Sequence, residues 1–283
     1  MRRRLFAVAT AVLATSASVV PAANADLKQS AVVSTNPADS TPHVLDGAVR
    51  AVAVVGGKVI VGGNFEKVRE AGSGKPEIAR HNIFAFDLKT GKVDGTFKPA
   101  VNGTVYALEP GPADTVYAAG SFGTVNGAAL GALAQLKVPT GVAITTFKPR
   151  VGGGIVFTMV RRNAHIYIGG RFTKVATKPR TVLARVDATT GNVDDTFNLT
   201  VSTPRQGDLK VFKLAVNPQD TRLLINGTFT MVAGQRRYQI AMIDTTAKPA
   251  ALTTWSTERY ATPCNPNSFD TYMRGMDFAP DGS

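Results

Sequence analysis

A short pattern, Gly-x-Phe-x-x-Val, occurs four times in this chain of 283 residues. Its phenylalanines are separated by 57, 50 and 57 residues, and a threonine followed by an aromatic residue recurs at a similar interval. Self-similarity at a period of this size indicates a repeat architecture, in which each unit packs against its neighbours. The repeated positions are Gly63, Phe65, Gly120, Phe122, Gly170, Phe172, Gly227 and Phe229, with Phe97, Phe147, Phe197 and Trp255 as the second aromatic of each unit.

Within each repeat the residue pattern is that of short β-strands. Ala184 and Val186 point one way and Arg185 the other, which is the period of two expected in a strand. No window shows a sustained helical period, so the chain is predicted to be all-β. In the third repeat the four expected strands are Ile155 to Val160, Ala164 to Phe172, Val182 to Val186 and Val193 to Phe197.

Four strands in about 50 residues match one blade of a β-propeller. The chain is therefore predicted to contain four antiparallel, four-stranded blades, at approximately residues 45–100, 101–150, 151–200 and 201–260. Residues 271–283 resemble the opening strand and turn of a fifth unit, so we expect an incomplete ring and a fragment of a longer product.

The small residues before each repeated phenylalanine predict a bulge or a close backbone approach. The phenylalanine that follows is expected to pack between blades. A phosphate-binding loop is not indicated, because no helix follows the glycines. Trp255 takes the place of Phe97, Phe147 and Phe197, and is expected to lie in the core.

The first 25 residues have the pattern of a secretory signal peptide. Three arginines precede an apolar stretch that ends in Ala23-Asn24-Ala25, which predicts cleavage between Ala25 and Asp26. Residues 26–44 then form a lead-in to the repeats. Arg3-Arg4 leaves open a twin-arginine signal, which would imply export of folded protein. No later run is long enough to span a membrane, so the chain is expected to be secreted, extracellular or associated with the cell wall.

The chain is basic, with a formal net charge of +12 that falls to +9 without the three signal arginines. An exported basic protein favours an anionic wall polymer, a glycan or an extracellular protein as partner, although scattered charge can also serve solubility. Nucleic acid is not expected, because the densest basic group lacks aromatics for base stacking. The single cysteine, Cys264, could be free, intermolecular, or paired in a disulfide with a residue beyond Ser283.

The third unit, with Gly169 to Val175 followed by Ala184 to Phe197, resembles the delta-60-type repeats of secreted bacterial β-propellers. The resemblance covers roughly Leu45 to Ser256 and implies an extracellular propeller. It implies no catalytic residues, because the family's function is unsettled.

The remaining motifs predict no catalytic, cofactor or metal site. The stretch around Asp187, Thr190 and Gly191 also looks like the docking motif of quinoprotein propellers, but Asp195 stands at its tryptophan position and a turn explains the pattern. The three histidines lack zinc-binding spacing, and the five glutamates show no repeated pair. We therefore expect a binding or scaffold module that presents loops to a cell-surface polymer, glycan or protein. The alternative is a hydrolase or quinone-type oxidoreductase whose site is assembled across blades.

Overall fold

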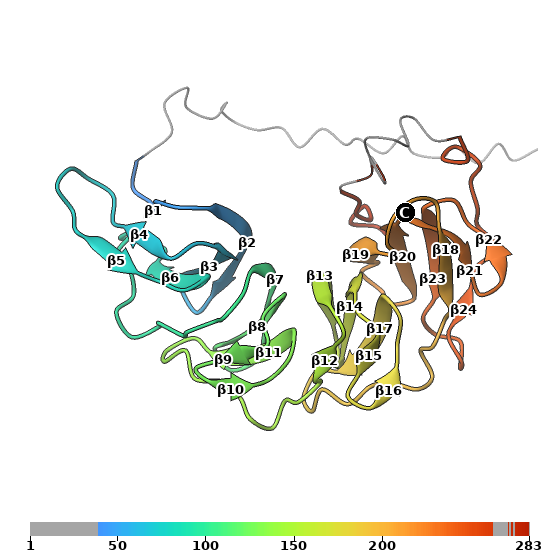
Figure 1. Cartoon of the computed structure of the whole chain (residues 1–283), viewed down its shortest axis with the longest axis horizontal. Coiled ribbons are helices and arrows are strands. Elements are labelled where there is room, and N and C mark those ends of the chain that lie inside the picture. The colour runs from blue at the N-terminus through green and yellow to red at the C-terminus, as the bar shows by residue number, and fades with distance from the viewer. Residues whose placement is uncertain (1–38, 263–270, 272, 274, 283) are drawn as a thin grey trace, which may run out of the picture. The chain divides into compact units, whose positions relative to one another are not determined.

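The computed structural model describes residues 39–262, 271, 273 and 275–282 (Figure 1). All of them belong to one compact unit, Asp39–Ser283. These residues form strands and no helix, and hence no helix that could cross a bilayer. Ala25, Asp26 and Cys264 lie outside the described residues, so cleavage and disulfide formation stay predictions.

Four antiparallel sheets, here called blades 1 to 4, follow one another along the chain. Each has three main strands, and the second strand in sequence is the central one. The strands are β2 (Ala48–Val55), β3 (Lys58–Asn64) and β6 (Ile83–Asp87) in blade 1; β7 (Val105–Pro110), β8 (Thr115–Gly120) and β11 (Leu133–Lys137) in blade 2; β13 (Ile155–Arg162), β14 (His165–Arg171) and β17 (Leu183–Asp187) in blade 3; and β19 (Val211–Val216), β20 (Arg222–Gly227) and β23 (Ile240–Asp244) in blade 4.

The fourth, outermost segment of each blade is short. In blade 4 it is a strand, β24 (Ala251–Leu252), whereas in blades 1 to 3 it pairs through one isolated bridge, such as Val186 with Val193. The expected strand from Val193 to Phe197 ends at once because the carboxylate of Asp194 accepts hydrogen bonds from the backbone N–H (2.8 Å) and hydroxyl (2.7 Å) of Thr196. Such local side-chain bonds compete with a β-ladder and turn the chain.

A second, smaller ladder accompanies each blade and was not foreseen from the sequence. It pairs the segment entering the blade with a hairpin formed after the blade's second strand. Its strands are too short to show a periodic pattern. They are β1 (His43–Val44), β4 (Lys67–Arg69) and β5 (Glu77–Ala79); β9 (Thr124–Val125) and β10 (Ala128–Ala129), with a bridge from Val101 to Val125; β12 (Val151–Gly152), β15 (Lys174–Val175) and β16 (Lys178–Pro179); and β18 (Val201–Pro204), β21 (Phe229–Val232) and β22 (Gln235–Arg236).

The core consists of layers between successive blades, and the two repeated aromatics meet in each layer. Phe97 of blade 1 and Phe122 of blade 2 belong to one buried cluster. The next two layers repeat the arrangement with Phe147 and Phe172, and with Phe197 and Phe229. All of these rings are at most 2 % exposed. The first strand of each blade is the innermost one, namely β2, β7, β13 or β19, and these strands of neighbouring blades also pack together. Blades 1 and 4 do not meet, so the ring is open (Figure 1).

The repeated glycine permits a close approach between the central and innermost strands. A Cβ atom on Gly170 would lie 2.1 Å from the carbonyl oxygen of Ile155, and the other three repeats show the same conflict at 1.9 to 2.1 Å. Any larger residue would force the two strands apart. The repeated glycine therefore has a structural role, because it allows the two strands of the blade to pair closely.

The expectation that Trp255 is buried was wrong, because 40 % of its surface is exposed. Phe97, Phe147 and Phe197 are buried because each faces the sheet of the following blade. Among the described residues no complete blade follows blade 4, so the Trp255 ring has no facing sheet.

Candidate binding site

A β-bulge interrupts the innermost strand of every blade at the same place. In β13 the register with β14 shifts between Val156 and Thr158, which leaves Phe157 as the extra residue. Val156 is buried in the layer toward blade 2, and Thr158 packs against Gly169 beside blade 4. Because both faces of the sheet are covered, the bulge projects Phe157 from its inner edge.

The four bulged residues form a row across the inner edges of the blades, here called the axial row. Its members are Arg50, Tyr106, Phe157 and Phe212, on β2, β7, β13 and β19. The rings of Tyr106 and Phe157 pack edge to face with centroids 5.5 Å apart, and Phe157 stacks on Phe212 at 5.8 Å. These three aromatics are half-buried and Arg50 is exposed. Half-buried rings on neighbouring strands form an apolar platform.

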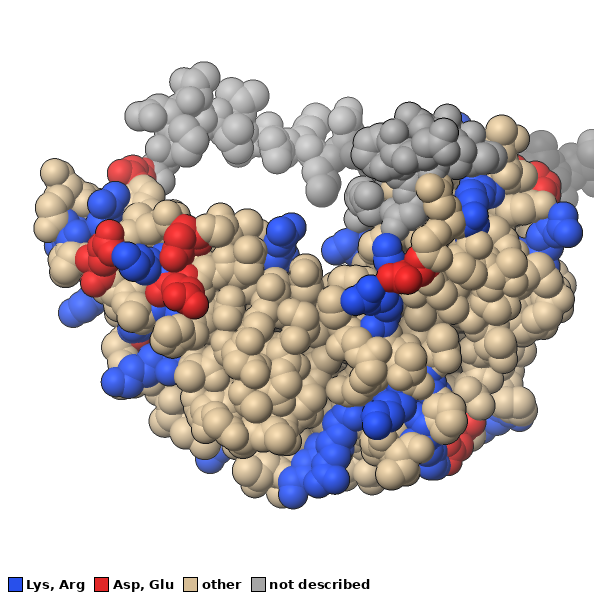
Figure 2. Space-filling view, in the orientation of Figure 1, with Lys and Arg blue, Asp and Glu red and all other residues tan. Residues whose placement is uncertain are grey.

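Cationic groups accompany the axial row. Arg50 occupies the bulge position of blade 1, and the ammonium of Lys210 lies 5.7 Å from the centroid of the Phe212 ring. Basic side chains are also distributed over several blades on the face seen in Figure 2, where carboxylates gather in a few places. Aromatic faces beside fixed positive charge suit a ligand that combines an apolar ring face with negative charge.

Glu109, farther along β7, is a titratable residue that its surroundings alter strongly. Burial raises the pKa of its carboxyl group to about 7, although the nearby guanidinium groups of Arg162 and Arg161 partly oppose this effect. A carboxyl group with such a pKa can hold or release a proton near neutral pH.

The Asp-x-x-Thr-Gly stretches are turns, as the sequence predicted. One carboxylate oxygen of Asp187 accepts hydrogen bonds from the backbone N–H of Thr189 (3.0 Å) and from the N–H (2.7 Å) and hydroxyl (2.8 Å) of Thr190. Asp87 repeats these contacts in blade 1. The bond from the Thr190 N–H is the main reason that the pKa of Asp187 is lowered. The carboxylate thus stabilises its own turn.

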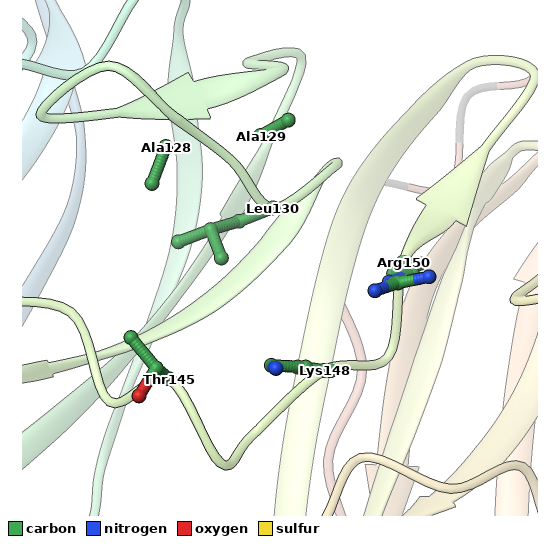
Figure 3. Close-up of a pocket in the computed structure, with 6 residues that line it drawn as sticks. All are labelled: Ala128, Ala129, Leu130, Thr145, Lys148 and Arg150. Carbon is green, nitrogen blue, oxygen red and sulfur yellow. The ribbon is translucent and has the colours of Figure 1, made fainter.

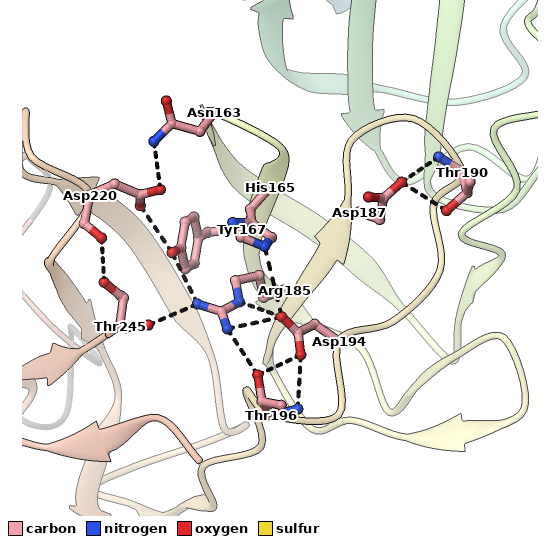
Figure 4. Close-up of polar contacts among 10 residues, drawn as sticks. All are labelled: Asn163, His165, Tyr167, Arg185, Asp187, Thr190, Asp194, Thr196, Asp220 and Thr245. Carbon is pink, nitrogen blue, oxygen red and sulfur yellow. Dashed lines mark hydrogen bonds and ion pairs between the residues drawn. The ribbon is translucent and has the colours of Figure 1, made fainter. Parts of the chain in front are cut away.

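A polar network around Arg185 joins blades 3 and 4 (Figure 4). Arg185 is only 4 % exposed, and its guanidinium donates to the carboxylate of Asp194 (2.9 Å) and to the carbonyl of Thr245 (3.2 Å) in blade 4. The hydroxyl of Tyr167 donates to Asp220 at 3.1 Å. His165 contributes its Nε2, 3.9 Å from Asp194. The network resembles a catalytic cluster in composition, but its groups bind one another across the interface between blades.

The residues singled out from the sequence are spread through the repeats. The repeated phenylalanines lie in separate layers. His43 and His81 both belong to blade 1, in β1 and just after β5, whereas His165 begins β14 in blade 3. Within the described parts of the chain, no three His, Cys, Asp or Glu side chains gather in a way that could hold a metal ion.

Sequence reasoning missed the axial row. A usable signal was present, since each member directly follows a valine at the same place in the repeat: Val49, Val105, Val156 and Val211. Three of the four residues that follow are aromatic. The bulge that gives them a common direction depends on strand pairing, which no single strand reveals.

A match to one family model agrees with the propeller architecture. Residues 165–197 match the model of a family described as a β-propeller domain of unknown function (DUF5122). No curated protein matches the chain. Among solved structures, the computationally designed Ika4 protein is 15 % identical, with a TM-score of 0.37 over 66 % of this chain and 90 % of that one. The WD40 domain of Neurospora crassa Pan2 is 13 % identical, with a TM-score of 0.43 over 74 % of this chain and 54 % of that one.

Proposed function

We propose that this β-propeller is an extracellular binding module that holds a cell-surface glycan at the axial row. The observation that carries the proposal is the bulge shared by all four innermost strands, which displays Arg50, Tyr106 and Phe157 together. A β-bulge disrupts the regular hydrogen bonding between two strands and changes the direction of a side chain, and bulges are frequent next to functional sites. Sugar rings present apolar C–H faces that can stack on aromatic rings, and Arg50 would pair with an acidic sugar.

Secretion is part of this proposal and is supported by the signal-peptide pattern of residues 1–25. The delta-60 resemblance of the repeats supports the same location. N-terminal sequencing of protein recovered from culture medium should begin at Asp26. Recovery of the exported protein with Met1 intact would contradict the predicted processing.

Binding can be tested with defined oligosaccharides. Isothermal titration with a hexagalacturonate and with a neutral hexasaccharide should give saturable binding, stronger for the acidic sugar. Phe157→Ala should weaken both by about tenfold, because the central ring of the row is lost. Arg50→Gln should weaken only the acidic one. Trp255→Ala removes an exposed aromatic ring outside the row and serves as the matched control. Equal loss in the control, or no saturable binding by the unaltered chain, would refute the proposal.

A second candidate function, hydrolysis across blades, is favoured by Glu109 alone. Its raised pKa, about 7, suits a general acid. Hydrolysis of a glycan by the unaltered chain, abolished by Glu109→Gln, would replace the binding proposal with this one.

A further inference from the structure

A hollow of about 230 Å³ lies between the outer hairpin of blade 2 and the linker that leads to blade 3. Its lining residues are Ala128, Ala129 and Leu130 from the hairpin side, Thr145 from the outer turn, and Lys148 and Arg150 from the linker (Figure 3). The hollow therefore has an apolar wall and a cationic wall. None of the residues that line it belongs to the axial row.

The apolar wall is a departure from the repeat. In the other three repeats the position of Leu130 is an arginine, namely Arg80, Arg180 or Arg237. Each is buried and donates from its guanidinium to the carbonyl oxygen of the preceding residue at 2.7 to 2.8 Å. The corresponding hollow of the first repeat is lined by Arg80 itself, which is already bound to backbone carbonyls. The second repeat has Leu130 in place of this arginine, so it lacks the buried guanidinium but still has the hollow.

The cationic wall is held in place by its backbone. The N–H of Lys148 donates to the carbonyl of Thr190 at 2.9 Å. The N–H of Ala176 donates to the carbonyls of Pro149 (3.0 Å) and Arg150 (3.2 Å). Within residues 39–262, the side chains of Lys148 and Arg150 form no hydrogen bond or ion pair, and both are exposed. Two positively charged side chains therefore line the hollow, and the backbone that carries them is held by hydrogen bonds.

Arg150 also has a strained backbone. Its φ angle is 48°, in the left-handed region that a residue with a Cβ atom rarely adopts. Ala100 and Thr200, at the equivalent positions of the neighbouring linkers, have no positive φ. Strain of this kind persists where the surrounding structure enforces it, and it is concentrated at functional sites.

We propose that this hollow binds a phosphate ester group. The arginine fork can hold two phosphate oxygens, while the lysine ammonium and the Thr145 hydroxyl supply further donors. The alanines and Leu130 would contact the carbon skeleton of the ester and lower the local dielectric constant, which strengthens the charge interaction. The ligand class is a phosphorylated sugar or polyol, either free or as one unit of an anionic polymer.

The test is isothermal titration of the whole chain with inorganic phosphate, glycerol phosphate and glucuronate at an ionic strength of about 20 mM. Glycerol phosphate should bind saturably, inorganic phosphate more weakly and glucuronate more weakly still. Lys148→Gln/Arg150→Gln should weaken binding of glycerol phosphate by at least about tenfold. The control, Lys89→Gln/Lys137→Gln, removes the same charge from exposed sites elsewhere and should change it by less than about twofold.

Arg150→Gly separates binding from folding. Glycine tolerates a positive φ, so this variant should keep the melting temperature of the unaltered chain while losing affinity. Equal weakening in the lysine control would overturn the proposal by showing that net charge alone attracts the ligand. Glucuronate binding as tight as that of glycerol phosphate would overturn the assignment to phosphate, and so would full affinity in Arg150→Gly.

Discussion

At the residue scale, each inter-blade layer depends on a few fully buried rings. Phe172 is 1 % exposed and belongs to the layer between blades 2 and 3, together with Phe147. Interiors of this kind are close-packed, so a missing ring leaves a cavity that the surrounding strands fill only in part.

Phe172→Ala is therefore expected to lower the free energy of unfolding by about 3 to 5 kcal/mol. Urea denaturation followed by circular dichroism measures the change. Val142→Ala, at a side chain that is 53 % exposed, is the control and should have little effect. Equal losses in the two variants would contradict the central place of the buried ring.

A second prediction at the residue scale concerns Glu109. Burial raises the pKa of its carboxyl group from 4.5 to about 7. The folded chain binds this proton more tightly than the unfolded chain, so stability falls as the pH rises through that interval. Glu109→Gln removes the titration. Relative to the unaltered chain, its melting temperature should rise between pH 5 and pH 8. A difference between the two proteins that stays constant with pH would rule out this origin.

At the element scale, carboxylates stabilise the turns after the third strand in blades 1, 3 and 4, where Asp94, Asp194 and Asp244 accept hydrogen bonds from nearby threonines. Asp94 accepts hydrogen bonds from the N–H and hydroxyl of Thr96 (2.8 and 2.7 Å) and pairs with Lys58 at 3.2 Å. Burial by itself would raise the pKa of Asp94, but these bonds outweigh burial and lower it to about 2. Lys58 and Asp94 also connect the central strand to the outer turn.

Asp94→Asn should therefore destabilise the chain mainly above the ordinary pKa of the carboxyl group. The contribution of a carboxylate with a lowered pKa is complete above 3.8 and is lost as the pH falls toward about 2. Melting temperatures measured from pH 2 to pH 6 should differ most at pH 6 and converge at the acid end. Asp114→Asn, at an exposed rim position, should follow the unaltered chain. If the difference in melting temperature between Asp94→Asn and the unaltered chain were largest at pH 2, the stabilising role of the Asp94 carboxylate would be contradicted.

At the scale of the whole molecule, the ring is open, and within residues 39–262 no other blade covers the face of blade 1 that points away from blade 2. Its apolar surface lines a hollow that includes Val52, Val59 and Phe84. Val52 and Val54 are 57 % and 51 % exposed, whereas Leu108, Met159 and Leu214, which take the place of Val52 in blades 2 to 4, are buried against the preceding blade. A sheet face built for burial but left exposed favours association.

We expect two copies of the chain to associate through this face. Light scattering over a concentration series should show reversible association, and Val52→Asp/Val54→Asp should abolish it. Val142→Asp introduces the same charge at an exposed valine of blade 2 and should leave association intact. Monomeric behaviour of the unaltered chain at all concentrations would refute the prediction.

The sequence by itself determined the class of the fold and the repeat. Period-two alternation and the recurring glycine and phenylalanine are local patterns, and they predicted an all-β propeller because they follow from the geometry of one strand and its turn. The tertiary structure decided the axial row, the short accessory strands, the exposure of Trp255 and the hollow beside Leu130. Each of these depends on groups from more than one strand or blade. A bulge is defined by the pairing of two strands, and Trp255 is exposed because no sheet faces it. Lys148 and Arg150 line the hollow because hydrogen bonds to blade 3 hold the linker that carries them. The four residues of the axial row were therefore not predicted, although they stand at one position of a repeat that was predicted.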